Sequence, residues 1–176
     1  GLSADGTVVS GTVTDYTRIA STDTAWGIAG KETWYVADGI VNIITTTYDY
    51  DNNKNVYNPV EIKGNVNVIL KNNAEVSVVN GIAGTDATIT FYSESESASG
   101  VIGLIGAYGD DGKNGQTESF ESTTPGESGE NGLVAVDVAS LTVAGGTITI
   151  IGGDGGDGGR GGFYTATGVY GVGGDG

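Results

Sequence analysis

The clearest pattern in the sequence is an alternation of apolar and polar residues over short stretches. Between positions 60 and 70 the apolar side chains Val66, Val68 and Leu70 share one parity, and the polar Asn67 separates the first two. Successive side chains of a β-strand point to opposite faces, so this period of two predicts a strand with one buried face.

Other stretches rich in Val, Ile and Thr predict further strands, at 7–13, 33–36, 40–44, 76–79, 89–92, 133–138, 141–143 and 147–151. The segment 14–24 is polar, and the turn-rich segment 45–58 predicts a loop. No stretch has the 3.6-residue period of an amphipathic helix. The sequence therefore predicts an all-β fold, with either a β-solenoid or β-helix-like core or a β-sandwich core.

Glycine follows a different pattern, because many of the 33 glycines recur at every third position. A period of three matches neither a strand nor an α-helix, but it matches an extended helix of the polyproline-II type. The glycines that form these structural repeats are Gly103, Gly106, Gly109, Gly112, Gly115, Gly126, Gly129, Gly132, Gly153, Gly156, Gly159, Gly162, Gly168, Gly171 and Gly174.

Glycine along one face of such a helix lets neighbouring backbones approach and exchange hydrogen bonds. The sequence therefore favours packed glycine-triplet (polyglycine or polyproline-II-type) helices, and flexible glycine-rich loops are the alternative. We expect one domain over 1–176. It comprises an N-terminal strand and arm at 1–32, a β core at 33–100, a triplet insert at 101–132, and strands plus triplets at 133–176.

The net charge of the chain limits the classes of partner that it can bind. With 22 acidic and 7 basic residues the formal net charge is −15, which disfavours nucleic acid and anionic lipid. No apolar run is long enough to cross a bilayer, so we expect no membrane insertion. The chain contains no Met, even at position 1, and we expect a processed chain or a fragment.

The sequence lacks the side chains that several classes of catalysis and covalent cross-linking require. There is no Cys and no His, which removes disulfides, thiolate nucleophiles and the commonest general base. No glycine-rich stretch has the lysine or the following helix of a phosphate-binding loop. We therefore expect a protein that is not an enzyme and needs no cofactor, with Ca²⁺ as the exception considered next.

One loop has oxygen-bearing side chains at alternate positions, namely Asp49, Asp51, Asn53 and Asn55. A looping backbone with this spacing can surround Ca²⁺. Lys54 and Val60 stand where an EF-hand has glycine and glutamate, so that motif is excluded. A solvated turn without metal is the alternative interpretation.

Aromatic residues crowd the N-terminal third of the chain. Exposed aromatic rings bind sugars and partner proteins, so the candidates for an interaction surface are Trp26, Trp34, Tyr35, Tyr48, Tyr50 and Tyr57. The same residues could instead fill a β core.

Five segments carry a family resemblance. They are Thr-Trp-Tyr-Val-Ala-Asp-Gly at 33–39, Val-Glu-Ile-Lys-Gly-Asn-Val-Asn-Val-Ile-Leu at 60–70, Asn-Gly-Ile-Ala-Gly at 80–84, Ala-Thr-Ile-Thr-Phe-Tyr-Ser at 87–93 and Gly-Gly-Thr-Ile-Thr-Ile-Ile-Gly-Gly at 145–153. In this order they resemble secreted, glycine-rich, β-helix-like surface proteins of Gram-positive bacteria. The resemblance implies stacked parallel coils and a cell-envelope location, and it brings no active site. The segment 93–97 and the insert 115–132 depart from the pattern.

Together these observations predict a non-catalytic, extracellular or cell-surface module for adhesion and interaction, with a host or cell-surface glycan or protein as partner. The alternative is a self-assembling subunit of an extracellular filament, in which the strand at 7–13 pairs with an edge of the next copy. Binding to ice or to another crystal surface is a minor alternative.

Overall fold

The computed structural model describes residues 11–51, 54–95, 100–117, 123–164, 169–170 and 172–176. All regular structure in these residues is β-strand, which confirms the all-β prediction. The described chain contains no helix that could span a membrane.

The described residues form thirteen strands. They are β1 (Thr17–Arg18), β2 (Ala25–Ala37), β3 (Ile40–Ile44), β4 (Thr46–Asp49), β5 (Lys54–Tyr57), β6 (Val60–Leu70), β7 (Glu75–Val79), β8 (Ile82–Ser93), β9 (Val101–Ile105), β10 (Val136–Val143), β11 (Thr147–Ile151), β12 (Phe163–Tyr164) and β13 (Val169–Tyr170). The chain forms two compact units: unit 1 comprises Gly1–Ile105 and Val134–Ile151, and unit 2 comprises Gly106–Leu133 and Gly152–Gly176.

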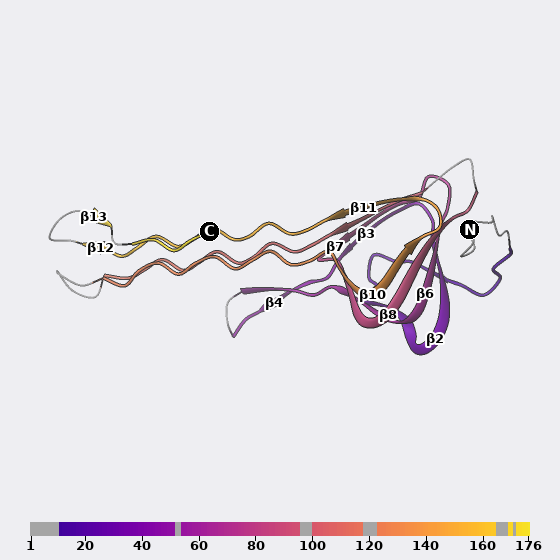
Figure 1. Cartoon of the computed structure of the whole chain (residues 1–176), viewed down its shortest axis with the longest axis horizontal. Coiled ribbons are helices and arrows are strands. Elements are labelled where there is room, and N and C mark those ends of the chain that lie inside the picture. Colours follow the sequence, from indigo (N-terminus) through magenta and orange to yellow (C-terminus); the bar gives the residue numbers. More distant parts are fainter. Residues whose placement is uncertain (1–10, 52–53, 96–99, 118–122, 165–168, 171) are drawn as a thin grey trace. The chain divides into compact units, whose positions relative to one another are not determined.

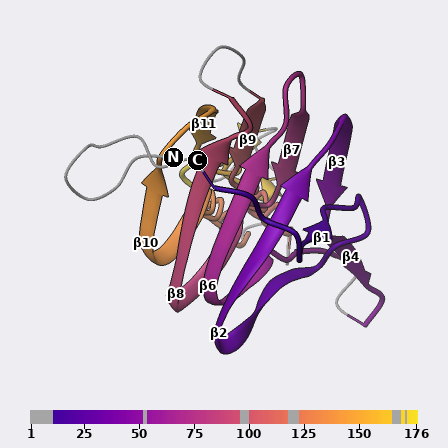
Figure 2. The ribbon, with the colours of Figure 1, turned by 90° about the vertical axis from the view of Figure 1, so that its right-hand side faces the viewer.

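Unit 1 consists of two sheets of parallel strands together with the β4–β5 hairpin. The five-stranded sheet has the order β1-β2-β6-β8-β10, and the four-stranded sheet has the order β11-β9-β7-β3. Figure 2 shows β2, β6, β8 and β10 side by side, with β3, β7, β9 and β11 in the second sheet. The strands therefore come in successive windings, β2–β3, β6–β7, β8–β9 and β10–β11, and each winding adds one strand to each sheet.

The hydrophobic core of unit 1 lies between the two sheets. Parallel pairing stacks equivalent residues of successive windings, so Val68 on β6 is aligned with Phe91 on β8, and Val78 on β7 with Leu104 on β9. All four side chains are fully buried in one apolar cluster. The alternation between positions 66 and 70 correctly identified the inner face of β6.

The strand predicted between positions 60 and 70 bends at Lys63-Gly64 without ending there. β6 runs from Val60 to Leu70, and its register with β8 shifts between Glu61 and Asn65. Gly64 has a φ of 68° there, and a Cβ would lie 2.4 Å from the carbonyl oxygen of Ile28. Glycine thus allows a β-bulge in which neighbouring strands approach closely.

Other boundaries also differ from the sequence prediction. The segment 45–58, predicted as a loop, contains the antiparallel hairpin of β4 and β5. The predicted strands 133–138 and 141–143 are replaced by one strand, β10, which begins at Val136, and β2 begins at Ala25, within the predicted arm. Of the predicted strand 7–13, residues 11–13 are described and form no strand, and 7–10 lie outside the described residues.

Unit 2 is built from extended glycine-triplet runs. The runs are 106–117, 123–133, 152–162 and 172–176, shown as wavy segments running side by side in Figure 1. Their hydrogen bonds recur at every third residue: the N–H groups of Gly109, Gly112 and Gly115 donate to the carbonyl groups of Asp154, Asp157 and Arg160 at 2.7–2.9 Å. Because these partners advance together along the chain, the runs 106–117 and 152–162 are parallel.

The run 123–133 is antiparallel to both of these runs. Its Glu127 and Glu130 N–H groups donate to the carbonyl groups of Lys113 and Asp110, and its own carbonyl groups accept bonds from run 152–162. The short run 172–176 accepts bonds from Gly126 and Gly129. The strands β12 and β13 form an antiparallel pair between the last two runs. The described glycine runs are therefore bonded to one another rather than free.

Candidate functional site

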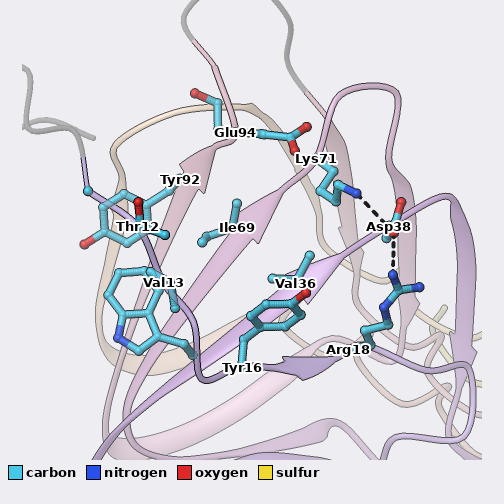
Figure 3. Close-up of a pocket in the computed structure, with 13 residues that line it drawn as sticks. Thr12, Val13, Tyr16, Arg18, Val36, Asp38, Ile69, Lys71, Tyr92 and Glu94 are labelled. Carbon is cyan, nitrogen blue, oxygen red and sulfur yellow. Dashed lines mark hydrogen bonds and ion pairs between the residues drawn. The ribbon is translucent and has the colours of Figure 1, made fainter.

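The five-stranded sheet carries a groove on the face that points away from the core (Figure 3). Its volume is about 770 Å³. Its floor is an apolar row, because the parallel register aligns Val36 on β2 with Ile69 on β6, and Ile69 with Tyr92 on β8. Residues 11–13 and Tyr16, which precede β1, also line the groove. The groove is thus formed by the outer side of three strands and by the segment that precedes them.

Two aromatic rings lie against each other in this groove. The ring centroids of Trp34 on β2 and Tyr92 on β8 are 5.4 Å apart, with an angle of 29° between the ring planes. The strand β6 separates their two strands in the sheet, so the two rings meet across β6. A third ring, that of Tyr16, lines the groove and is 46% exposed. Aromatic faces carry a negative quadrupole, which attracts polarised C–H groups such as those of a sugar ring.

Charged residues follow the apolar row at the ends of the same strands. Asp38, Lys71 and Glu94 come directly after β2, β6 and β8, respectively, and all three line the groove. Asp38 Oδ2 lies 3.1 Å from Arg18 Nη2 and 3.3 Å from Lys71 Nζ. Glu94 Oε2 accepts a hydrogen bond of 3.0 Å from the N–H of Asn72.

The charges in the groove balance, because Arg18 and Lys71 face Asp38 and Glu94. The side chain of Arg18 is 69% exposed and that of Asp38 is 32% exposed, so their ion pair is screened by solvent and contributes little to stability. These groups can therefore exchange their contacts for hydrogen bonds to a ligand. The arrangement fits an uncharged, polar ligand with an apolar face.

The six aromatic residues predicted to form an interaction surface lie in different parts of the structure. Trp34 lies in the groove. Trp26 is fully buried in the core, so it is a core residue and not a surface for partners. Tyr35 belongs to the opposite face of β2 from Trp34, where it packs on the core and its hydroxyl accepts a hydrogen bond of 2.8 Å from Gly27 N–H. Strand alternation explains why neighbours in sequence have opposite roles.

The other three predicted aromatic residues belong to the β4–β5 hairpin and its turn. Tyr48 and Tyr50 form an edge-to-face pair with centroids 4.9 Å apart, and Tyr50 is 86% exposed. Tyr57 lies on β5 and is partly buried. None of the three lines the groove.

The predicted calcium ligands occupy the same hairpin. Asp49 ends β4, Asn55 lies on β5, and Asp49 Oδ1 accepts a hydrogen bond of 3.0 Å from the N–H of Asp51. That bond is typical of an aspartate in a solvated turn. Asn53 lies outside the described residues. Among the residues that are described, no group of three or more acidic side chains is close enough to hold a metal ion.

The predicted glycine repeats fall into two groups. Gly103 lies in β9, where an added Cβ would meet its nearest atom only at 4.0 Å, so it belongs to the sheet and not to the triplet runs. Gly168 and Gly171 lie outside the described residues. The remaining repeat glycines belong to unit 2, and at each of them a Cβ would lie within 2.4 Å of the backbone of another run.

Sequence reasoning missed Tyr16, Tyr92, Lys71 and Asp38 as groove residues. A signal for them is present in the spacing, because the next-to-last residue of β2, β6 and β8 is apolar and a charged residue follows two positions later, as in Val36-x-Asp38. Residues two apart share a face of a strand. Which strands are neighbours decides whether such pairs meet, and the alternation within one strand does not contain that information.

No family model, curated protein or solved structure matches this chain.

Proposed function

We propose that this chain is a non-catalytic, extracellular interaction module of a microbial surface, and that it binds an uncharged polysaccharide in the groove over β2, β6 and β8. The observation that carries the proposal is the contact between Trp34 and Tyr92 in an open groove edged by charged side chains. Aromatic rings offer large, rigid contact area, and the polar groups beside them can bond to sugar hydroxyl groups.

The charge distribution supports an uncharged ligand. The chain as a whole has a formal net charge of −15, which repels anionic polymers at a distance. Within the groove both cations, Arg18 and Lys71, already pair with Asp38. A ligand carboxylate would have to displace Asp38, whereas a hydroxyl group can bond alongside it.

The proposal includes a finer description of the fold. We propose that unit 1 is a short β-solenoid, because its two sheets contain only parallel neighbours and each winding adds one strand to each. Sandwich sheets are commonly antiparallel. We propose that unit 2 is a bundle of polyglycine helices of the polyproline-II type, since its hydrogen bonds repeat at every third residue. Both features support the resemblance to secreted, glycine-rich, β-helix-like proteins and an extracellular location.

Affinity electrophoresis tests the proposed function. The purified chain is run through native gels that contain mixed-linkage β-glucan, arabinoxylan or glucomannan as uncharged polymers, and polygalacturonate as a charged one. We expect at least one uncharged polymer to retard the wild-type chain. Trp34→Ala and Tyr92→Ala should weaken that binding about tenfold or more, as loss of a central aromatic contact commonly does.

The matched control is Tyr50→Ala, which removes an aromatic ring that is 86% exposed and outside the groove. This variant should bind as the wild type does. The proposal fails if none of the uncharged polymers retards the chain, or if Tyr50→Ala weakens binding as much as Trp34→Ala.

A further inference from the structure

The two ends of unit 1 are covered to different degrees. At the first winding the inward-facing side chains of Ala37, Val41 and Ile43 are buried. Trp26, near the start of β2, and Ile19, directly after β1, are buried as well. Ile19 N–H donates to the carbonyl group of Val36 at 3.0 Å, and β1 pairs with β2. The N-terminal segment therefore closes this end of the core.

The last winding, β10–β11, is not closed in this way. Leu104 on β9 is fully buried, yet Ile150, its partner on β11, is 51% exposed. On the other sheet Phe91 is fully buried, and its partner Val143 on β10 is 48% exposed. Equivalent inward-facing positions are therefore fully buried in the winding β8–β9 and about half exposed in the last winding, β10–β11.

Within the described residues, the outer edges of β10 and β11 also have no strand partner, because these are the last strands of their sheets. The N–H of Ala144 donates to Phe91, and that of Thr147 donates to Gly100. Because N–H groups alternate in direction along a strand, those of Val143, Ile148 and Ile150 point to the open edge.

The open edge lacks the charged residues that normally protect an exposed sheet edge against association with another sheet. β11 contains no charged residue, and Asp137 is the only one on β10. Natural sheets discourage edge-to-edge association with Lys, Pro or inward-pointing charges. Terminal repeats of stacked proteins likewise have a polar outer face when they meet solvent. The last winding has neither protection.

We propose that the open end, formed by β10 and β11, pairs with the open end of a second copy of this chain across a twofold axis. In this dimer β10 lies antiparallel to β10 of the second copy, and β11 does the same. The dimer buries Val143 and Ile150 and gives the unpaired N–H groups their acceptors. A head-to-tail contact is disfavoured, because it needs the first end of the second copy, where the core is already covered. A symmetric contact uses one surface twice and closes on itself.

Light scattering coupled to gel filtration tests this proposal on the full chain, from about 1 to 200 µM. We expect the wild type to have twice the mass of one chain at the upper concentrations. Ile150→Lys places an inward-pointing charge at the open edge and should give the mass of a single chain, with the equilibrium shifted by about 100-fold or more. Val143→Lys does the same from the other sheet.

Ile151→Lys is the matched control. Ile151 is 52% exposed, against 51% for Ile150, but its side chain points to the other face of β11, so this variant should remain a dimer. Circular dichroism establishes that each variant is folded, and if Ile150→Lys is not folded the result is taken from Val143→Lys. A wild type that stays monomeric at 200 µM overturns the proposal. So do open polymers, or equal loss of dimer in Ile151→Lys.

Discussion

At the scale of single residues, the glycines of unit 2 differ in what they allow. Gly156 is buried, and a Cβ there would lie 2.2 Å from the carbonyl oxygen of Asp110. Its neighbour Gly155 is exposed, and the nearest atom to its Cβ would be 3.5 Å away. Neither has a positive φ, so the difference between them is one of space alone.

This difference gives a prediction for adjacent substitutions. Gly156→Ala should destabilise unit 2 by about 1–3 kcal/mol, because the methyl group overpacks against backbone. Gly155→Ala should leave stability unchanged or raise it by about 0.4–1 kcal/mol, since it restricts only the unfolded chain. Hydrogen exchange of the Gly109 and Gly112 amides, which are bonded to run 152–162, measures the effect. Equal protection in both variants would contradict the assignment of an inner and an outer glycine.

The period of three depends only on local geometry, and each described repeat glycine of unit 2 is one whose Cβ would meet backbone, whereas Gly103 lies in β9. The period was less informative about the side chains between these glycines. Ala107 is buried, but Tyr108 is 63% exposed and Val172 is 76% exposed. Backbone hydrogen bonds hold the described runs together, so the apolar content of a triplet says little about whether the runs are packed.

At the scale of elements, the segment before β2 has a structural role that its polar composition conceals. Asp23 Oδ2 accepts hydrogen bonds of 3.0 Å from both the N–H of Ala20 and Nε1 of Trp26. Trp26 is fully buried, so this carboxylate satisfies an indole N–H that water cannot reach. The segment thereby attaches the covered end of the core to β2.

Asp23→Ala should therefore lower the free energy of unfolding by about 1–3 kcal/mol, since it leaves a buried donor without a partner. Urea unfolding followed by tryptophan fluorescence measures the loss. Asp86→Ala, at an exposed position on β8, is the control and should change stability by less than about 0.5 kcal/mol. A similar loss in both variants would mean that the hydrogen bonds of Asp23 are not the cause.

Strand alternation predicted the buried face of β6 at Val66, Val68 and Leu70, because residues two apart share a face whatever the fold. It could not predict the groove. Trp34 and Tyr92 are far apart in sequence and come from strands separated by β6, so their contact depends on parallel pairing in a given register. The contribution of Tyr16 depends on where the N-terminal segment crosses the sheet, which local patterns do not encode.

At the scale of the whole molecule, the main feature is an excess of negative charge. The 22 acidic residues far outnumber the 7 basic ones, so at most a minority of the carboxylates can pair with a basic side chain. The excess negative charge therefore repels itself in the folded state. Such repulsion destabilises a compact chain and is screened by salt.

We expect the midpoint of thermal unfolding to rise by about 2–4 °C between 10 and 300 mM NaCl, which corresponds to about 1 kcal/mol for a chain of this size. Differential scanning fluorimetry at one fixed protein concentration measures it. KCl should act equally, because screening depends on ionic strength. A midpoint that falls with salt would mean that the ion pairs outweigh the repulsion. A further rise at micromolar Ca²⁺ would indicate a specific calcium site.

The three-residue spacing of hydrogen bonds in unit 2 also constrains how this region can change in length. An insertion of one or two residues in a run rotates every later glycine away from its neighbours, whereas a whole triplet restores the frame. Even then the partner runs must lengthen together. Such a region can evolve or be engineered only in steps of about 9 Å, the rise of one triplet, and in genes by insertions of nine nucleotides. The glycine repeat therefore sets the smallest change in length that keeps the hydrogen bonds of this unit in register.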